Sequence, residues 1–362
     1  MGVYDAVVVG GGPAGSAAAL RLSRLGAHVL LLEKQRIGRD KPCGGGLTPR
    51  AQELLPAPID DLVLTRVDAV DLLGDGDEHI RMHLGNSRVL MVRRAAFDAR
   101  LMETACSEGV HLHDREPVTS MRNDRAGVSV ETTRATYRSH TLLLATGAEA
   151  PLRSSLRLNT GVDTLAVALE IEGPATARRL APNRIVFDYR VPGGYAWVFP
   201  KGDIWNVGIL STRRDVGPRL RGMLMDFIAR AGVAFDAPVA VRVRGHRIPL
   251  HTTSRPLARG RVALLGDAAG LADAFYGEGI AQALLSGRLA ADAVLQCLNG
   301  DAAALFRYQR RLDRSMGRHS RRMRFIARGV YRKPGLATAM LRMPPVRRAA
   351  VNVAMESFDD AG

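Results

Sequence analysis

Short apolar runs alternate with a helical pattern at the start of the chain. Tyr4–Val9 and residues 27–32 are rich in β-branched and aliphatic side chains, as expected of strands buried in a parallel sheet. Between them, small and apolar residues over 16–25 repeat with helical spacing. Two further runs of the same kind lie at 141–145 and 261–265. The pattern predicts a strand–helix–strand unit whose sheet is completed by distant parts of the chain.

A second group of segments has the short, alternating pattern of antiparallel strands. We expect strands at 67–73, 80–84, 89–92, 110–112, 118–121, 128–132, 136–138, 165–172, 185–189, 195–199, 204–210 and 239–247, and helices at 94–106, 219–231 and 279–297. The stretch Gly74-Asp75-Gly76-Asp77 is predicted to form the hairpin turn between the first two of these strands.

These elements predict the α/β fold class. We expect a Rossmann-like domain that binds a nucleotide, an inserted antiparallel β-sheet domain that holds a substrate, and a helical C-terminal tail. The nucleotide-binding domain is discontinuous, at 1–60, 90–150 and 255–300. The substrate domain covers 61–89 and 151–254, and the basic helical segment covers 301–362.

A glycine-rich turn follows the first strand with the spacing GxGxxG, at residues 10–15. Gly10 permits the tight turn, Gly12 lets the backbone approach a pyrophosphate, and Gly15 lets the helix pack closely on the strand. Glu33 ends the second strand, where an acid accepts hydrogen bonds from a ribose hydroxyl. A structural glycine turn would not explain this acid, so we predict a dinucleotide site.

The second nucleotide signal lies about 250 residues further on. Residues 266–270 read GDAAG after a buried strand, which places Asp267 where it can hold a ribose or ribityl hydroxyl. Residues 277–279 read GEG, and Ile280 opens a long helix whose N-terminal amides would face an electron-rich ring. The alternative is an ordinary helix start after a glycine turn. Because GxGxxG occurs once, the pair of motifs favours one resident FAD over NAD.

Positive charge is concentrated near the C-terminus. The 362-residue chain has a net charge of +15, and residues 307–350 hold 13 arginines, one lysine and one acid. Such a segment is either a set of solvated helix faces, or a surface for anionic lipid, or a docking site for an acidic electron-donor protein such as ferredoxin. We favour the lipid. No nucleic-acid-binding motif accompanies the charge, so nucleic acid is not expected.

Cysteine and histidine usage argues against metal centres. Cys43, Cys106 and Cys297 are too few and too scattered for a disulfide scaffold or an iron–sulfur cluster. His79 and His83 stand on a predicted strand without a third ligand, so no metal is expected. Neither a signal peptide nor a membrane-spanning run is evident. We expect a cytoplasmic protein, peripheral on the inner face of the membrane if the tail docks there.

Two stretches carry a resemblance to a known family. Residues 41–46, KPCGGG, and 192–200, PGGYAWVFP, resemble motifs of the geranylgeranyl reductase family, whose FAD fold is similar to that of aromatic hydroxylases. The Arg94-x-x-Phe97-Asp98 helix start fits the same fold. The resemblance implies an FAD enzyme that hydrogenates C=C bonds of a polyprenyl chain on a lipid, quinone or diphosphate. The electron donor, NAD(P)H or ferredoxin, stays open.

The resemblance also implies a set of FAD contacts. By motif, these fall on Ala14, Glu33, Cys43, Gly44, Gly46, Arg94, Val118, Asp267, Gly279 and Ile280.

Four side chains are candidates for the catalytic pocket. Tyr195 and Trp197 share one face of a predicted strand and would line an apolar channel, or else pack in a core. Tyr276, just before GEG, is a candidate proton donor, or a packing residue. Cys43 is a candidate redox or proton-donating thiol, or a small side chain packed on the flavin ring.

The main rival hypothesis is an FAD-dependent monooxygenase or halogenase that acts on an aromatic substrate. Thr146-Gly147 stands where many hydroxylases carry Asp-Gly, which weakens this alternative.

Overall fold

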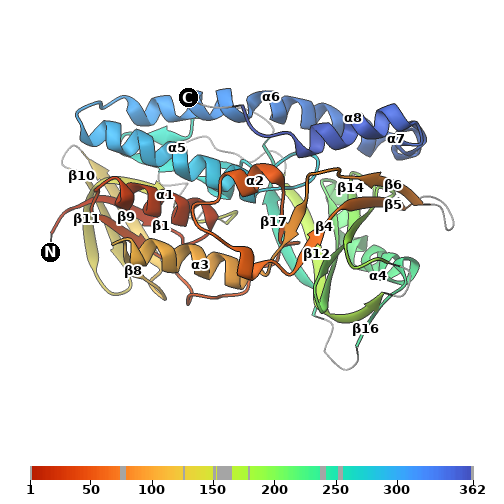
Figure 1. The fold of residues 1–362 in the computed structure, drawn as a ribbon. Coiled ribbons are helices and arrows are strands. Elements are labelled where there is room, and N and C mark those ends of the chain that lie inside the picture. Colours follow the sequence, from red (N-terminus) through yellow and green to blue (C-terminus); the bar gives the residue numbers. More distant parts are fainter. Residues whose placement is uncertain are drawn as a thin grey trace.

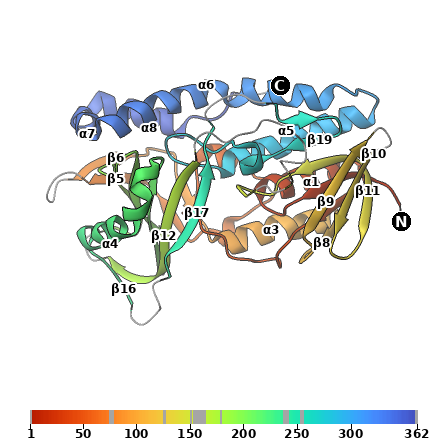
Figure 2. The ribbon, with the colours of Figure 1, turned by 180° about the vertical axis from the view of Figure 1, so that it is seen from behind.

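The computed structural model describes residues 2–73, 79–124, 127–149, 152, 165–177, 180–236, 242–251 and 256–359. Two large sheets lie side by side beneath a layer of C-terminal helices (Figure 1). Seen from behind, the same layer covers both sheets (Figure 2).

The first sheet carries the nucleotide motifs and has the strand order β18-β19-β11-β1-β2-β8. Its strands are β1 (Tyr4–Val9), β2 (Val29–Leu32), β8 (His111–His113), β9 (Val118–Asp124), β10 (Gly127–Thr132), β11 (Thr136–Leu144), β18 (Ala258–Arg259) and β19 (Val262–Leu264). β1 pairs in parallel with β2 and β11, and β11 pairs in parallel with β19. The prediction that distant runs complete this sheet is therefore confirmed.

One strand of this sheet is longer than predicted. The pattern indicated separate strands at 136–138 and 141–145, but β11 is continuous. Its first half pairs with β10, and its second half lies between β1 and β19. Because each half has its own partners, the change of pattern near Ser139 marks a change of neighbours and not a break.

Three helices pack beside the first sheet: α1 (Pro13–Arg24), α3 (Arg94–Ser107) and α5 (Ile280–Leu298). Their apolar faces bury residues such as Leu20, Met102 and Ala290 in one core with Ala6 and Val8 of β1. These helices begin next to the glycine-rich motifs, so the packing of this core fixes where those motifs lie.

The second sheet has the order β16-β12-β15-β14-β13-β5-β6, with β17 paired to β12. Its strands are β5 (Ala69–Leu73), β6 (His79–His83), β12 (Leu165–Ala177), β13 (Arg184–Asp188), β14 (Gly194–Lys201), β15 (Ile204–Ser211), β16 (Val233–Phe235) and β17 (Arg244–Pro249). All neighbours are antiparallel except β13 and β5. The predicted turn at 74–77 lies outside the described residues, as do residues 239–241 of the strand expected at 239–247.

Smaller elements join the sheets. These are β3 (Gly46–Leu47), β4 (Thr65–Val67) and β7 (Val89–Met91) in a third sheet, the helices α2 (Pro49–Glu53) and α4 (Leu220–Ala231), and the 3-10 turns η1 (Asp60–Leu62), η3 (Arg214–Arg219) and η4 (Gly266–Ala269). The predicted domain boundaries stay a prediction.

The C-terminal layer consists of α6 (Ala304–Arg332), α7 (Pro334–Leu341) and α8 (Pro344–Met355). Pro334 and Pro344 begin α7 and α8, where the missing N–H of proline breaks no helical hydrogen bond. α6 contributes Leu312 to the core of the first sheet and Met323 to that of the second. Among the described residues, no helix is long and apolar enough to cross a membrane.

Candidate functional site

One cavity of about 550 Å³ collects nearly all the predicted site residues. Its walls include Gly10, Gly12, Ala14, Glu33, Cys43, Gly44, Gly46, Arg94, Val118, Tyr195, Trp197, Asp267, Tyr276, Gly279 and Ile280. Gly15 is the one predicted site residue that does not line it. The cavity starts at the β1–α1 turn, runs past the start of α5, and ends against the second sheet and α8.

The β1–α1 turn has the geometry that the motif predicts. Gly10 has φ +107°, and a Cβ there would lie 2.3 Å from the Ala145 carbonyl oxygen. A Cβ on Gly15 would lie 1.9 Å from the Gly10 oxygen, so Gly15 serves the packing of helix on strand. A Cβ on Gly12 would meet only Arg39, at 4.0 Å. Since α1 has no side-chain cap, its first amides are available to a phosphate.

Glu33 and Arg39 form a charged pair beside this turn. The Glu33 carboxylate accepts hydrogen bonds from the backbone N–H of Gly11 (2.8 Å) and of Gln35 (2.9 Å). Arg39 Nε lies 3.6 Å from Glu33, and its Nη1 lies 3.4 Å from Asp98. Arg39 therefore places a cation next to Gly12. Sequence reasoning missed it because no local pattern marks an arginine in a loop.

Arg94 is buried at the start of α3 and keeps its charge. Its guanidinium makes two hydrogen bonds to Asp98, at 3.0 and 2.9 Å, one helical turn away. Burial disfavours the charged form, but the Asp98 carboxylate and the adjacent Cys43 side chain outweigh it, so the pKa of Arg94 is raised. The cavity wall thus carries a fixed cation close to Cys43.

The two nucleotide motifs meet because α1 and α5 touch. A Cβ on Gly287 of α5 would lie 2.3 Å from the Ala14 oxygen, and one on Gly266 would lie 3.2 Å from the Ala14 Cβ. Asp267 lies beside Gly279, at the uncapped start of α5, and Lys41 Nζ is 3.5 Å from its carboxylate. The two motifs, about 250 residues apart in the sequence, are therefore in direct contact in the fold.

The donor groups of this half of the cavity fit FAD. Two uncapped helix starts and the cations Arg39 and Arg94 suit a pyrophosphate, and Glu33 and Asp267 suit hydroxyl groups. The buried hydroxyl of Thr146 also lines the cavity and has no hydrogen-bond partner among the described residues. Such an orphaned group is expected where a ligand supplies the partner.

The loop 41–46, which we call the Cys43 loop, rests on β14 of the second sheet. A Cβ on Gly44 would lie 2.4 Å from the Phe199 ring. Gly45 has φ +74°, and a Cβ there would lie 2.2 Å from the Val92 oxygen. Both glycines line the cavity, and close packing on Phe199 and Val92 is what requires them.

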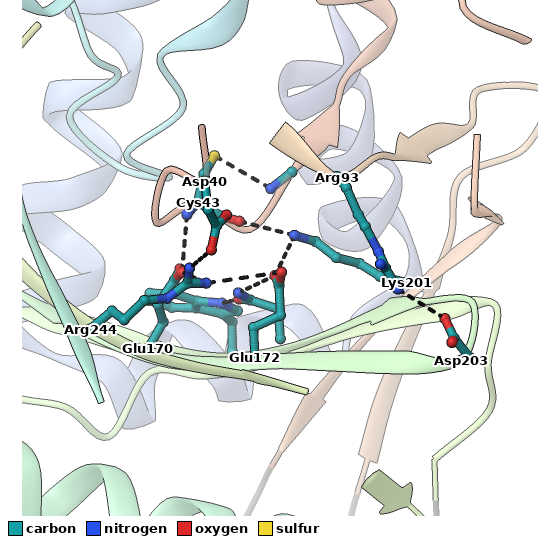
Figure 3. A network of polar contacts seen from close by, with 11 residues as sticks. Asp40, Cys43, Arg93, Glu170, Glu172, Lys201, Asp203 and Arg244 are labelled. Carbon is teal, nitrogen blue, oxygen red and sulfur yellow. Dashed lines mark hydrogen bonds and ion pairs between the residues drawn. The ribbon is translucent and has the colours of Figure 1, made fainter. Parts of the chain in front are cut away.

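Buried charges anchor the Cys43 loop, as Figure 3 shows. Lys201 Nζ donates to the Cys43 carbonyl at 3.1 Å and pairs with Glu172 at 2.6 Å. Glu170 accepts from the Cys43 N–H at 3.1 Å and from Arg244 at 3.0 Å. Burial raises the pKa of Glu170, and Arg244 opposes this in part. Both backbone groups of Cys43 are thus held by side chains of the second sheet.

This network was not predicted, although the sequence of β12 contains a pattern that indicates buried ion pairs. Glu170 and Glu172 are two acids at alternate positions of an otherwise apolar strand, so they share a face. Two acids on a buried face require cationic partners.

Tyr195 and Trp197 lie on one face of β14, as predicted, and their ring centroids are 5.8 Å apart. The Tyr195 hydroxyl donates to the Tyr276 carbonyl, and Trp197 Nε1 donates to Asn206 at 2.7 Å. Burial, with Asp273 nearby, raises the pKa of both tyrosine hydroxyls. Tyr195 and Trp197 therefore both pack in a core and line the cavity, while their part in catalysis stays a prediction.

The far end of the cavity is apolar. Its walls are Val70, Met82, Leu84, Val89, Ala168, Ile185, Phe187, Tyr189, Leu210 and Ile248, with Ala350, Val351, Ala354 and Met355 from α8. The wall made by α8 was missed, because the tail was judged on its charge. In the part of the chain that the structure describes, no cluster of His, Cys, Asp and Glu could hold a metal ion.

Comparisons with known proteins agree with this geometry. A family model described as pyridine nucleotide-disulphide oxidoreductase matches residues 4–181. A geranylgeranyl diphosphate reductase of Rhodobacter capsulatus is 32% identical over 83% of this chain and 77% of its own length. A digeranylgeranylglycerophospholipid reductase of Methanosphaera stadtmanae is 28% identical over 80% and 78%.

Two solved structures share the fold. A geranylgeranyl bacteriochlorophyll reductase-like protein of Thermoplasma acidophilum has a TM-score of 0.77 at 23% identity, covering 99% of this chain and 94% of that one. A flavin-dependent brominase has a TM-score of 0.79 at 19% identity, covering 100% and 96%. Together, the motifs, the cavity and the similarity to the R. capsulatus reductase show that the chain belongs to the geranylgeranyl reductase family of FAD-dependent oxidoreductases.

Proposed function

We propose that this enzyme hydrogenates C=C bonds of a polyprenyl chain carried on a lipid, a quinone or a diphosphate. The observation that carries the proposal is the continuity of one cavity, from the dinucleotide motifs to an apolar end walled by Phe187, Tyr195 and Trp197. A chain of isoprene units offers only apolar surface, which such walls bind by excluding water. The names of the two relatives support the same substrate class.

FAD, when bound and reduced, supplies a hydride to one alkene carbon. The protein's own task is to hold an unactivated double bond close and dry, which the aromatic and aliphatic walls would do. The Cys43 loop is fixed to the second sheet by Lys201 and Glu170, so the wall that joins the two halves of the cavity is rigid.

A proton must reach the second alkene carbon. The Tyr195 hydroxyl proton is engaged by the Tyr276 carbonyl, so Tyr195 acts as a wall and a support in this proposal. Cys43 and Tyr276 are then the candidate donors, since both line the cavity. In this account, Cys43→Ser and Tyr276→Phe lower the rate of alkene reduction without loss of FAD.

The test is an anaerobic single turnover. The FAD-loaded enzyme is reduced with light or dithionite, mixed with geranylgeranyl diphosphate or a geranylgeranylated lipid, and the product is weighed by mass spectrometry. We expect flavin reoxidation and a gain of two hydrogens for each bond reduced. Reoxidation by oxygen alone would refute the proposal.

The likeness to a brominase leaves halogenation or hydroxylation of an aromatic substrate as the second candidate. In the same assay with oxygen and halide, an oxygenated or halogenated product would support it. NAD(P)H and a ferredoxin-type protein are the two electron donors to compare.

A further inference from the structure

One face of α6 carries a continuous row of exposed arginines. The row, which we call the arginine stripe, consists of Arg307, Arg310, Arg314, Arg318, Arg321, Arg328 and Arg332. Successive members are three or four residues apart, except where Phe325 takes one place, so all lie on one side of the helix. The stripe is about 38 Å long at the rise of an α-helix. α6 forms the outer edge of the molecule in both views (Figures 1 and 2).

Most of this charge has no counter-charge among the residues that the structure describes. Arg307 pairs with Asp301 and Arg318 with Asp359, while the other five members form no ion pair with any residue that the structure describes. The sequence has no Asp or Glu between Asp313 and Glu356.

Crowding of like charge is evident at Arg324, which borders the stripe. Partial burial and the neighbouring Arg328 and Arg321 lower the pKa of Arg324. A surface that repels itself in this way gains stability when an external anion neutralises it.

Apolar side chains project among and beyond these arginines. Phe325 is 79% exposed, although it stands within the stripe. α7 has no buried residue, and Leu336 and Met340 on it are 58% and 49% exposed, followed by Met343 at 55%. Arginine beside exposed phenylalanine, leucine and methionine is typical of helices that lie in a lipid interface. An acidic protein partner would explain the arginines but not the apolar side chains.

The same helical layer also walls the cavity. Ala350, Val351, Ala354 and Met355 of α8 line its apolar end. α8 is linked to α7 by a short turn, and Glu356, the residue after α8, forms an ion pair with Arg322 of α6. A surface that binds lipid through α6 and α7 would therefore hold this end of the cavity near the bilayer.

We propose that the arginine stripe, with Phe325 and the exposed apolar side chains of α7, docks the protein on an anionic phospholipid bilayer. The docking gives the cavity access to prenyl chains that are dissolved in the membrane, and in this respect it rests on the proposed function. The binding itself does not depend on turnover, so the two proposals can fail separately.

The test is co-sedimentation of the FAD-loaded, full-length protein with vesicles. Vesicles of phosphatidylglycerol and phosphatidylcholine are compared with phosphatidylcholine alone, at low and high salt. Each basic residue near an anionic surface contributes about fivefold to partitioning, so Arg321→Gln/Arg328→Gln should weaken binding about 30-fold. The matched control Arg214→Gln/Arg221→Gln removes the same charge from an exposed region near α4, far from α6, and should leave binding unchanged.

Phe325→Ser should also weaken binding, and more so at high salt, where the apolar contribution remains. FAD content checks that each variant is folded. Equal loss in the control, binding that ignores lipid charge, or no binding at all would overturn the proposal. So would stripe variants that bind vesicles normally and slow only reduction by a ferredoxin-type protein. Normal vesicle binding without polyprenyl reduction would instead refute the proposed function, while the docking proposal would stand.

Discussion

Replacement of Lys201 by methionine tests whether buried charge anchors the Cys43 loop. Lys201 is 1% exposed, and its Nζ lies 2.6 Å from Glu172 and 3.1 Å from the Cys43 carbonyl. Methionine fills a similar volume but leaves Glu172 with Asn206 at 2.9 Å and the more distant Arg244 at 3.9 Å as its polar partners. Removing one partner of a buried pair costs about 3–5 kcal/mol. Because the Glu172 side chain keeps 15% exposure, we expect the lower end, about 3 kcal/mol.

The assay is urea unfolding followed by far-UV circular dichroism and by flavin fluorescence. Arg81→Met is the matched control, since it breaks a pair with Asp71 of similar length, 2.9 Å, in the same sheet, but the Arg81 side chain is 41% exposed and Asp71 keeps Arg184 at 3.6 Å. That pair should contribute about 1 kcal/mol or less. Lys201→Met/Glu172→Gln should be less destabilised than Lys201→Met alone, because no buried charge is left unpaired. If Lys201→Met costs no more than Arg81→Met, the anchoring argument is wrong.

Three further predictions follow from packing and from charge. Gly287→Ala should reduce FAD binding and stability, because the new Cβ would lie 2.3 Å from the Ala14 oxygen. Gly329→Ala has open space around it and should instead stabilise the protein by up to about 1 kcal/mol. Thermal melts and FAD content measure both variants. Burial and Arg324 lower the pKa of His251 below its ordinary 6.5. The unfolded chain therefore binds the extra proton first, and the stability of the folded protein falls as pH drops below 6.5. His251→Asn should flatten that part of a profile of melting temperature against pH. Ala354→Phe should raise KM for long prenyl chains more than for short ones by filling the apolar end of the cavity, while Ala349→Phe, on the exposed side of α8, should change neither.

The sequence predicted those parts of the site that depend on local backbone geometry. Gly10 and Gly15 stand where a side chain would clash with Ala145 or Gly10, so their positions follow from the turn itself. The fold class and the meeting of the first strands with distant runs were predicted because buried parallel strands have a recognisable composition.

The parts that were missed depend on contacts between distant segments. Arg39 reaches Glu33 and Asp98 from a loop without a motif, and Lys201 reaches the Cys43 loop from another sheet. The α8 wall was missed for a different reason. Its basic composition directed the interpretation to a lipid surface, but the small side chains Ala350 and Ala354 line the cavity.

α6 has a mechanical consequence for the whole molecule. Its first half is buried in the core of the first sheet and its second half in that of the second sheet, through Leu312 and Met323. A single helix about 43 Å long thus spans both cores. A hinge opening between the two sheets would have to bend this helix or detach one half of it from its core. We therefore expect the two cores to melt in one step. We also expect bound FAD to protect the second sheet from proteolysis, although the dinucleotide motifs belong to the first sheet.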